Sequence, residues 1–375
     1  MAVAAVEVTD ISGADWLAEV EGDMFDPRPV LQAEAARRIE KTGRLMLFYS
    51  GAVWNSGGGG QRPQQLAEGF NDEACVIHIN SLDSDHLEYP FKGPLVAEVP
   101  GWDQWGEAKH KVLYAGIPDE YSVQMAEDLG DDWFVWYDCL DDWRGFEKLP
   151  TGQGITWYDR GHEKQLLARA DLVTCTADVL AEHVRSIAGR RPPPIKVVYN
   201  STRLVGQPLH RGSRDMDCVM VGALGYDWID WGALRELAQR HSLLLVGHEP
   251  DTGHPFDHPN VEWTGQVDNT KLLRVLSRAK VGLVPFRDLP LVAAVYPIKY
   301  CDYLAAGMPT VATHLPELVG KPYASVAWDR KGFMAQVEEQ LSRRQPRRAI
   351  MAEARNNTVE QRIAHIKPWL GGIFS

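Results

Sequence analysis

Short apolar runs alternate with amphipathic stretches along most of the chain. Runs of this kind are typical of parallel strands that are buried on both faces of a sheet. The stretches between them predict helices, among them Gln64–Phe70 and Glu163–Ala170, and this alternation indicates βαβ units. In the first half the predicted strands are Leu45–Tyr49, Val76–Ile79, Leu95–Val99, Phe134–Tyr137, Leu172–Cys175 and Val197–Tyr199.

A turn-rich segment at Asn200–Asp217 interrupts this alternation, which then restarts. The restart predicts an α/β protein of two Rossmann-like, doubly wound domains, residues 1–203 and 204–357, that face each other across a cleft. A last helix at Thr358–Ile366 fits against either domain, so the segment 358–375 can pack back on the first. The predicted elements of the second domain are strands Cys218–Val221, Leu243–Val246, Val261–Trp263, Val281–Val284 and Thr310–Ala312, and helices Trp231–Arg240, Thr270–Arg278 and Ile298–Ala306.

The amino-acid composition and the net charge exclude several classes of protein. Hydrophobic residues make up 45% and charged residues 24%, which is typical of a globular protein and excludes disorder, collagen and coiled coil as the main state. The net charge of -12 argues against a general nucleic-acid binder. Acids clearly outnumber bases in residues 1–203, whereas bases slightly outnumber acids in the rest. We therefore expect an anionic ligand to be held mainly by the second domain.

The spacing of the cysteines and the hydropathy of the chain indicate the cellular compartment in which the protein works. The cysteines are dispersed and form no C-x-x-C pair, which indicates a reducing cytoplasm without disulfides and without a zinc site. No apolar run is long enough to span a bilayer, and the first residues lack the basic region of a signal peptide. The sequence thus predicts a cytoplasmic protein with no integral membrane segment. The five cysteines are Cys75, Cys139, Cys175, Cys218 and Cys301.

Four glycines, Gly57 to Gly60, separate the first predicted strand from the helix Gln64–Phe70, with Arg62 directly after them. Glycines allow the backbone to approach a ligand closely, and a helix N-terminus offers free N–H groups to an anion. The stretch is neither a dinucleotide fingerprint nor a Walker loop. On spacing alone, a flexible surface loop is an equal alternative.

Three carboxylates, Asp138, Asp141 and Asp142, follow the predicted strand Phe134–Tyr137. The carboxyl ends of parallel strands face the predicted cleft, and neighbouring like charges raise the pKa of a carboxyl, which suits a general base. Asp141 and Asp142 are therefore candidate bases. Capping of the following turn is the alternative interpretation of these two residues.

The helix Ile298–Ala306 begins after Pro297 and carries Lys299 and Asp302 three positions apart, on one face. A lysine near a helix N-terminus holds phosphate oxygens, and a carboxylate accepts hydrogen bonds from a ribose diol. The alternative is an ordinary salt bridge on a solvated face. His248 follows a predicted strand through a glycine and so can reach the cleft; a surface position fits equally well.

The order of these motifs resembles that of GT-B glycosyltransferases, in particular the family-4-like group that contains teichuronic acid glycosyltransferases. The resemblance extends over about 300 residues of the 375 and is specific because the motifs occur in the same order. The stretches that carry it are Gln61–Ala67, Tyr137–Asp142, Glu163–Asp171, Val221–Asp230 with Gly222, Asn260–Gly265 and Pro297–Pro309.

This resemblance implies a nucleoside-diphosphate sugar donor on the second domain, a UDP-sugar by default, and an acceptor glycan or small molecule on the first. It implies no metal and no cofactor. The expected positions near the reaction centre or the acceptor are Gly58, Gly59, Gly60, Arg62 and Asp138. The expected donor-binding residues are Lys299 at the diphosphate and Asp302 at the ribose, with Pro297, Gly222, His248 and Gly265.

The sequence departs from the family in one place. Family-4 enzymes usually carry two glutamates eight positions apart; Asp302 takes the second place, but Ala294 stands in the first. The chain is also similar to the xanthan glucuronosyltransferase, an inverting enzyme whose base is an aspartate of the first domain. That role falls here on Asp141 or Asp142, and both an inverting and a retaining reaction stay open.

Two other functions fit this pattern of residues. A nucleotide-sugar isomerase of the 2-epimerase type uses a related two-domain fold and needs no acceptor. A non-catalytic GT-B partner subunit is the second, and Ala294 favours it.

Overall fold

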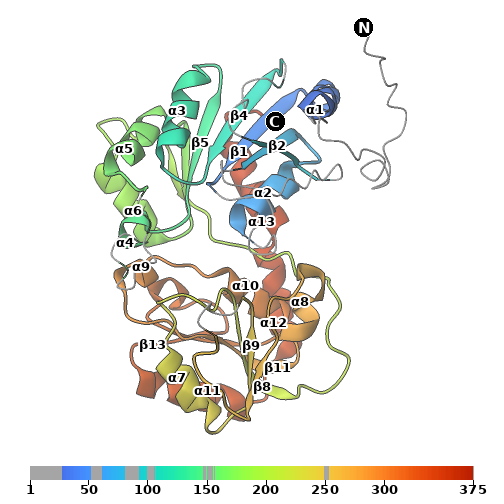
Figure 1. Ribbon diagram of the computed structural model, residues 1–375, viewed down its shortest axis with the longest axis vertical. Coiled ribbons are helices and arrows are strands. Elements are labelled where there is room, and N and C mark those ends of the chain that lie inside the picture. Colours follow the sequence, from blue (N-terminus) through green and yellow to red (C-terminus); the bar gives the residue numbers. More distant parts are fainter. Residues whose placement is uncertain are drawn as a thin grey trace.

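A computed structural model describes residues 28–51, 61–80, 93–98, 105, 107–146, 149, 155, 157–248 and 253–374 of the chain. The molecule contains two sheets of parallel strands, which lie one above the other along its longest axis. Helices cover both faces of each sheet (Figure 1). The strands of the first sheet all precede residue 200, and those of the second all follow residue 215. Among the described residues, no helix is long and apolar enough to cross a membrane.

The first sheet, as far as the chain is described, has the strand order β3-β2-β1-β4-β5-β6-β7, with every pair parallel. Its central strands are nearly all apolar, which suits burial on both faces. The strands are β1 (Arg44–Tyr49), β2 (Cys75–Asn80), β3 (Leu95–Glu98), β4 (His110–Ala115), β5 (Phe134–Cys139), β6 (Leu172–Cys175) and β7 (Ile195–Val197).

Alternate residues of these strands pack into two different cores. Leu45, Leu47 and Tyr49 point to one face, whereas Met46 and Phe48 point to the other, as the two-residue period of a strand requires. The first face is covered by α1 (Arg28–Thr42), α3 (Glu120–Asp128), α5 (Arg160–Arg169) and α6 (Asp178–Ile187). The second is covered by α2 (Arg62–Phe70) and α13 (Val359–Ile366).

The second sheet has the order β10-β9-β8-β11-β12-β13 among the described strands, again with parallel pairs. Its strands are β8 (Met216–Val221), β9 (Leu243–Val246), β10 (Val261–Trp263), β11 (Ala279–Val284), β12 (Thr310–Thr313) and β13 (Ala324–Ala327). The helices of this part are α7 (Trp231–Ala238), α8 (Asn269–Leu276), α9 (Pro290–Ala293), α10 (Ile298–Ala305), α11 (Arg330–Ser342) and α12 (Arg347–Ala354).

The predicted fold class is confirmed, and the predicted strands mostly coincide with observed ones to within two residues. The strand predicted at Val197–Tyr199 is wrong in its position. The observed strand β7 ends at Val197, and Tyr199 lies in the connection to the second domain. The sequence pattern did not predict β4, which begins with the polar residues His110 and Lys111, or β13, whose first three residues are only partly buried.

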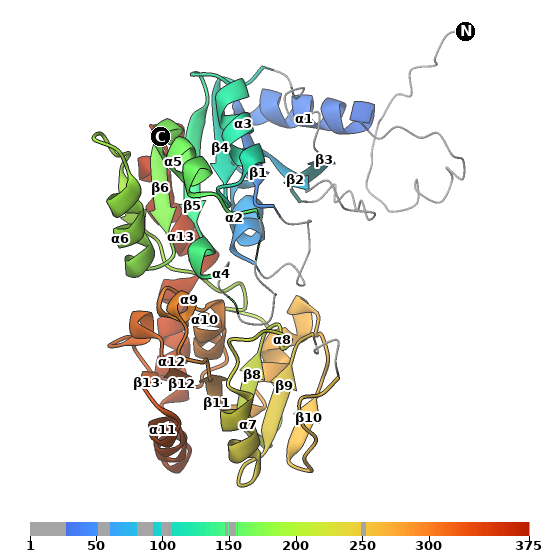
Figure 2. The ribbon, with the colours of Figure 1, turned by 60° about the vertical axis from the view of Figure 1, so that its left-hand side comes forward.

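The last helix, α13, lies beside α2 on the first domain, and the C-terminus lies within that domain in both views (Figures 1 and 2). Ile363 and Ile366 pack there against Phe70 and the second face of the sheet. The contact is close, since a methyl group added at Gly69 would lie 2.1 Å from the Ile363 side chain. The chain therefore crosses between the two domains twice.

We expect Ile363→Ala to lower the free energy of unfolding by about 2–5 kcal/mol, because the change leaves a cavity in the core that α13 shares with the first sheet. Denaturation in urea measures this. His365→Ala, at an exposed position of the same helix, should change the value by less than about 0.5 kcal/mol. Equal effects of the two changes would show that α13 does not pack on this core.

Candidate functional site

A cavity of about 610 Å³ lies between the two domains, at the carboxyl ends of their strands. The connection between the domains lines one part of it, through Asn200, Arg203, Leu204 and Gln207. The first domain contributes Gln61, Arg62, Pro63, Gln65, Leu140, Asp141 and Phe146. The second contributes Val221, Gly222, Ala223, Tyr226, Trp228, Asn269, Thr270, Leu272, Phe286, Leu291, Val292, Val295, Tyr296, Pro297, Ile298, Lys299 and Asp302.

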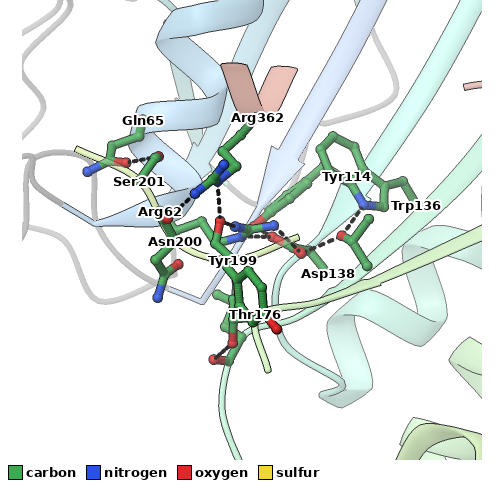
Figure 3. A network of polar contacts seen from close by, with 12 residues as sticks. Arg62, Gln65, Tyr114, Trp136, Asp138, Thr176, Tyr199, Asn200, Ser201 and Arg362 are labelled. Carbon is green, nitrogen blue, oxygen red and sulfur yellow. Dashed lines mark hydrogen bonds and ion pairs between the residues drawn. The ribbon is translucent and has the colours of Figure 1, made fainter. Parts of the chain in front are cut away.

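A buried ion pair between Arg62 and Asp138 stands at the first-domain side of the cavity (Figure 3). Arg62 donates from Nε to one oxygen of Asp138 at 2.7 Å and from Nη2 to the other at 3.1 Å. Tyr114 donates to the same carboxylate at 2.8 Å, and the hydroxyl of Thr174 donates to it as well. Asp138 is fully buried and is surrounded by donors, so it does not line the cavity.

The connection between the domains is fixed by two arginines. The carbonyl of Tyr199 accepts hydrogen bonds from Nη1 of Arg62 at 3.2 Å and from Nε of Arg362, in α13, at 2.9 Å (Figure 3). Asn200 donates to the carbonyl of Tyr296 in the second domain at 2.7 Å. Elements from both domains thus hold this segment.

Asp141 and Asp142 have different surroundings. Asp141 lines the cavity, and burial raises the pKa of its carboxyl to about 7, with a smaller contribution from the charge of Asp142. Asp142 does not line the cavity, and its Oδ1 accepts a hydrogen bond from Nε of Arg144 at 2.7 Å. Of the two candidates, Asp141 is the one placed to meet a ligand.

Lys299 and Asp302 both line the cavity from the first turns of α10. Burial lowers the pKa of Lys299 to about 8, although the charge of Asp302 opposes this. Burial raises the pKa of Asp302 to about 7, while its hydrogen bond from Thr202 at 2.6 Å lowers it. Within the described chain, Lys299 forms no ion pair, and its ammonium lies 4.8 Å from the centre of the Phe286 ring. The arrangement is not the ordinary salt bridge that the spacing also allowed.

Glycine is required where the backbone approaches Lys299. A Cβ at Gly247 would lie 1.8 Å from the carbonyl oxygen of Gly222, and a Cβ at Gly222 would lie 3.0 Å from the ammonium of Lys299. Both residues have positive φ, at +139° and +142° respectively. The two glycines therefore keep open the space in front of the lysine.

Only some of the other predicted site residues line the cavity. Pro297 occupies the position directly before α10, makes no capping hydrogen bond and lines the cavity. His248 is exposed, and neither His248 nor Gly265 lines the cavity. Gly58, Gly59 and Gly60 lie outside the described residues.

The sequence reading missed two amides on the connecting segment. The side-chain oxygens of Asn200 and Gln207 are buried and have no hydrogen-bond partner among the described residues, and both side chains line the cavity. Buried polar atoms of this kind are normally satisfied by a ligand or water. Only their place after a predicted strand could have pointed to them. In the described part of the chain, no group of histidine, cysteine and acidic side chains could hold a metal ion.

We expect Arg62→Met to lower the free energy of unfolding by about 3–5 kcal/mol, because the change leaves the Asp138 carboxylate buried without its counter-charge. Chemical denaturation measures this. Arg37→Met removes a matched arginine whose side chain is 64% exposed and should cost less than about 1 kcal/mol. A loss no larger than that of the control would contradict the structural role of the pair.

The pKa of Asp141 also predicts a pH dependence of stability. Because its folded-state pKa lies above the ordinary value of 3.8, its contribution is complete below that value and is lost as pH rises through about 7. Asp141→Asn lacks this titration, so the variant should gain stability relative to the wild type between about pH 4 and pH 8. Denaturation across this range measures the difference. A difference that stays constant across this range would contradict the shifted pKa of Asp141.

Comparison with known proteins agrees with this geometry. Residues 216–343 match the family described as Glycosyl transferases group 1. The teichuronic acid biosynthesis glycosyltransferase TuaH of Bacillus subtilis (strain 168), so named, is 28% identical over 213 residues, which is 50% of this chain and 53% of that protein. The chain thus matches about half the length of this relative.

Solved structures share the two-domain architecture. A sucrose-phosphate synthase from Thermosynechococcus elongatus superposes with a TM-score of 0.62 at 14% identity, covering 88% of this chain and 97% of that one. Anabaena HepE, solved in complex with UDP, has a TM-score of 0.59 at 14% identity, with 87% and 99% covered. The chain therefore has the GT-B fold, and its residues 216–343 are similar to the group 1 glycosyltransferase family.

Proposed function

We propose that this protein transfers a sugar from a nucleoside-diphosphate sugar to a hydroxyl group of an acceptor. One observation carries the proposal: a single cavity has the Asp141 carboxyl, with a pKa of about 7, on one domain and the Lys299 ammonium on the other. A base that titrates near neutral pH and a cation for a leaving group are what such a transfer needs. UDP is the first candidate nucleotide, since HepE was solved with it.

The donor would lie on the second domain. Lys299, together with the N-terminus of α10, would bind the diphosphate, and its ammonium supplies the positive charge for the leaving group without a metal ion. One oxygen of Asp302 accepts from Thr202, which leaves the other for a ribose hydroxyl. The side-chain oxygens of Asn200 and Gln207, for which the described residues provide no partner, can accept from further hydroxyl or N–H groups of the donor.

Asp141 would act as the general base. Its carboxylate removes the proton of the acceptor hydroxyl, whose oxygen then attacks the anomeric carbon from the face opposite the diphosphate. The bond from that carbon to the diphosphate breaks, and the anomeric configuration inverts. Arg62 and Asp138 would keep the end of β5, and with it the backbone leading to Asp141, in place.

The first experiment is thermal stability in the presence of UDP, GDP, dTDP, ADP or CMP, with and without EDTA. Ligand at about 100 times its Kd should stabilise the protein by roughly 2.7 kcal/mol. We expect one nucleoside diphosphate to give this shift regardless of EDTA, and Lys299→Ala to abolish it. Lys280→Ala, a half-exposed lysine of the same domain that pairs with Asp217, should keep it. A response to none of the diphosphates would overturn the proposal.

Asp141→Asn should lower kcat by about 10²–10⁴-fold with little change in nucleotide binding, since it removes proton transfer only.

In the wild type, kcat/KM should fall as pH is lowered through about 7, because the base must be unprotonated. Full activity of Asp141→Asn, or a product of retained anomeric configuration, would contradict the role of Asp141 as the general base. The same assay without acceptor tests the 2-epimerase alternative, and binding without any turnover would indicate a non-catalytic subunit.

A further inference from the structure

Asn200 follows Tyr199 in the connection between the two domains, and its side chain lines the cavity (Figure 3). Its Nδ2 donates to the carbonyl of Tyr296 at 2.7 Å. Because a carbonyl oxygen can only accept, this bond fixes which end of the amide carries the N–H groups. The other end, the oxygen Oδ1, is buried and has no hydrogen-bond partner within the part of the chain that the structure describes.

The backbone around Asn200 runs along α10. The carbonyl of Asn200 accepts from Sγ of Cys301 at 3.5 Å, and two residues further on the hydroxyl of Thr202 donates to Oδ1 of Asp302 at 2.6 Å. Asn200 is thus held beside α10 both at Tyr296 and at the residue next to Asp302. These contacts place Asn200 and Asp302 on the same wall of the cavity, where the connection meets α10.

Asp302 offers a second acceptor on this wall. Its Oδ1 accepts from Thr202, which leaves Oδ2 for a ligand. Together with Oδ1 of Asn200, this gives two oxygens that both need a hydrogen-bond donor. A phosphate oxygen can satisfy neither of them, whereas two neighbouring hydroxyl groups can satisfy both.

The distance from Lys299 fits the ribose of a nucleotide. Lys299 and Asp302 are three positions apart on α10, and side chains at this spacing have Cβ atoms about 5–6 Å apart. In a nucleoside diphosphate, a single methylene group connects the first phosphate to the ribose ring. The transferred sugar is attached to the other phosphate and extends toward Asp141. A diphosphate at Lys299 therefore brings the ribose hydroxyls to the wall of Asp302 and Asn200.

We propose that Asn200 accepts a hydrogen bond from one ribose hydroxyl while Asp302 accepts from the other, so that the protein selects ribonucleoside diphosphates over 2′-deoxyribonucleoside diphosphates. This specificity rests on the proposed function. A deoxynucleotide leaves one buried oxygen without a donor, which should weaken binding by about 10- to 100-fold. Sugars activated with dTDP are then poor donors, since dTDP lacks the 2′-hydroxyl.

Binding of matched nucleoside diphosphates tests this specificity without any sugar or acceptor. The probes are the diphosphate that stabilises the protein against heat and its 2′-deoxy and 3′-deoxy forms; for uracil they are UDP, 2′-deoxy-UDP and 3′-deoxy-UDP. Isothermal titration calorimetry on the full chain should give each deoxy form a Kd about 10- to 100-fold higher than that of the parent.

Asn200→Ala removes one of the two acceptors. In this variant the penalty for one deoxy form should disappear, because no oxygen is left without a donor, while the penalty for the other form stays. The change also removes the hydrogen bond to Tyr296. Damage to the connection alone would weaken all three ligands equally and preserve both penalties, so the pattern separates direct binding from a structural role.

Asn260 provides a matched control. Its Nδ2 also donates to a carbonyl, that of Ala238 at 2.9 Å, but Asn260 does not line the cavity. Asn260→Ala should therefore keep both penalties of the wild type.

The outcomes separate this proposal from the proposed function. Equal binding of the parent and its deoxy forms, or a thermal shift with dTDP alone, would overturn the ribonucleotide specificity and leave sugar transfer standing. Persistence of both penalties in Asn200→Ala would overturn the role of Asn200. Failure of every nucleoside diphosphate to bind would overturn both proposals.

Discussion

The arrangement of the cavity depends on the buried ion pair between Arg62 and Asp138. A charged carboxylate is stable inside a domain only when hydrogen bonds replace the water it has lost, and Asp138 receives them from Arg62, Tyr114 and Thr174. These partners come from α2, β4 and the neighbouring strand β6. The pair therefore fixes the N-terminus of α2 against the end of β5, from which the chain runs directly to Asp141.

The same arginine holds the connection between the domains through the carbonyl of Tyr199, and the next residue, Asn200, donates to the carbonyl of Tyr296 in the second domain. A second contact between the domains lies at the start of α6, whose N-cap residue Ala177 has no side chain able to cap it. Glu317 of the second domain takes this role, since its Oε1 accepts from the N–H of Val179 at 3.2 Å. The hydrogen bonds of the connecting segment and the carboxylate of Glu317 at the start of α6 together hold the two domains against each other.

Much of this could be predicted from the sequence, because buried parallel strands leave a strong apolar signal and helix ends leave Pro and Gly. The helix with Lys299 and Asp302 could be predicted for the same reason, since Pro297 and Gly307 mark its limits. The difference between Asp141 and Asp142 could not be predicted, as it arises from Arg144 and from burial by distant residues. Nor could the pairing of Arg62 with Asp138, which lie 76 positions apart and meet only when the sheet has formed.

The return of α13 to the first domain has a consequence for how the chain matures. Residues 359–373 complete the core under the second face of the first sheet, next to Met46 and Phe48, which are among the first strand residues to be made. Domains generally fold in order as they leave the ribosome. Here α2 can cover part of that face early, but the part that α13 covers stays open until the second domain and residues 359–373 have been synthesised. The first domain therefore cannot complete its folding before the second domain has been made. We expect the nascent chain to need protection by chaperones until α13 emerges from the ribosome.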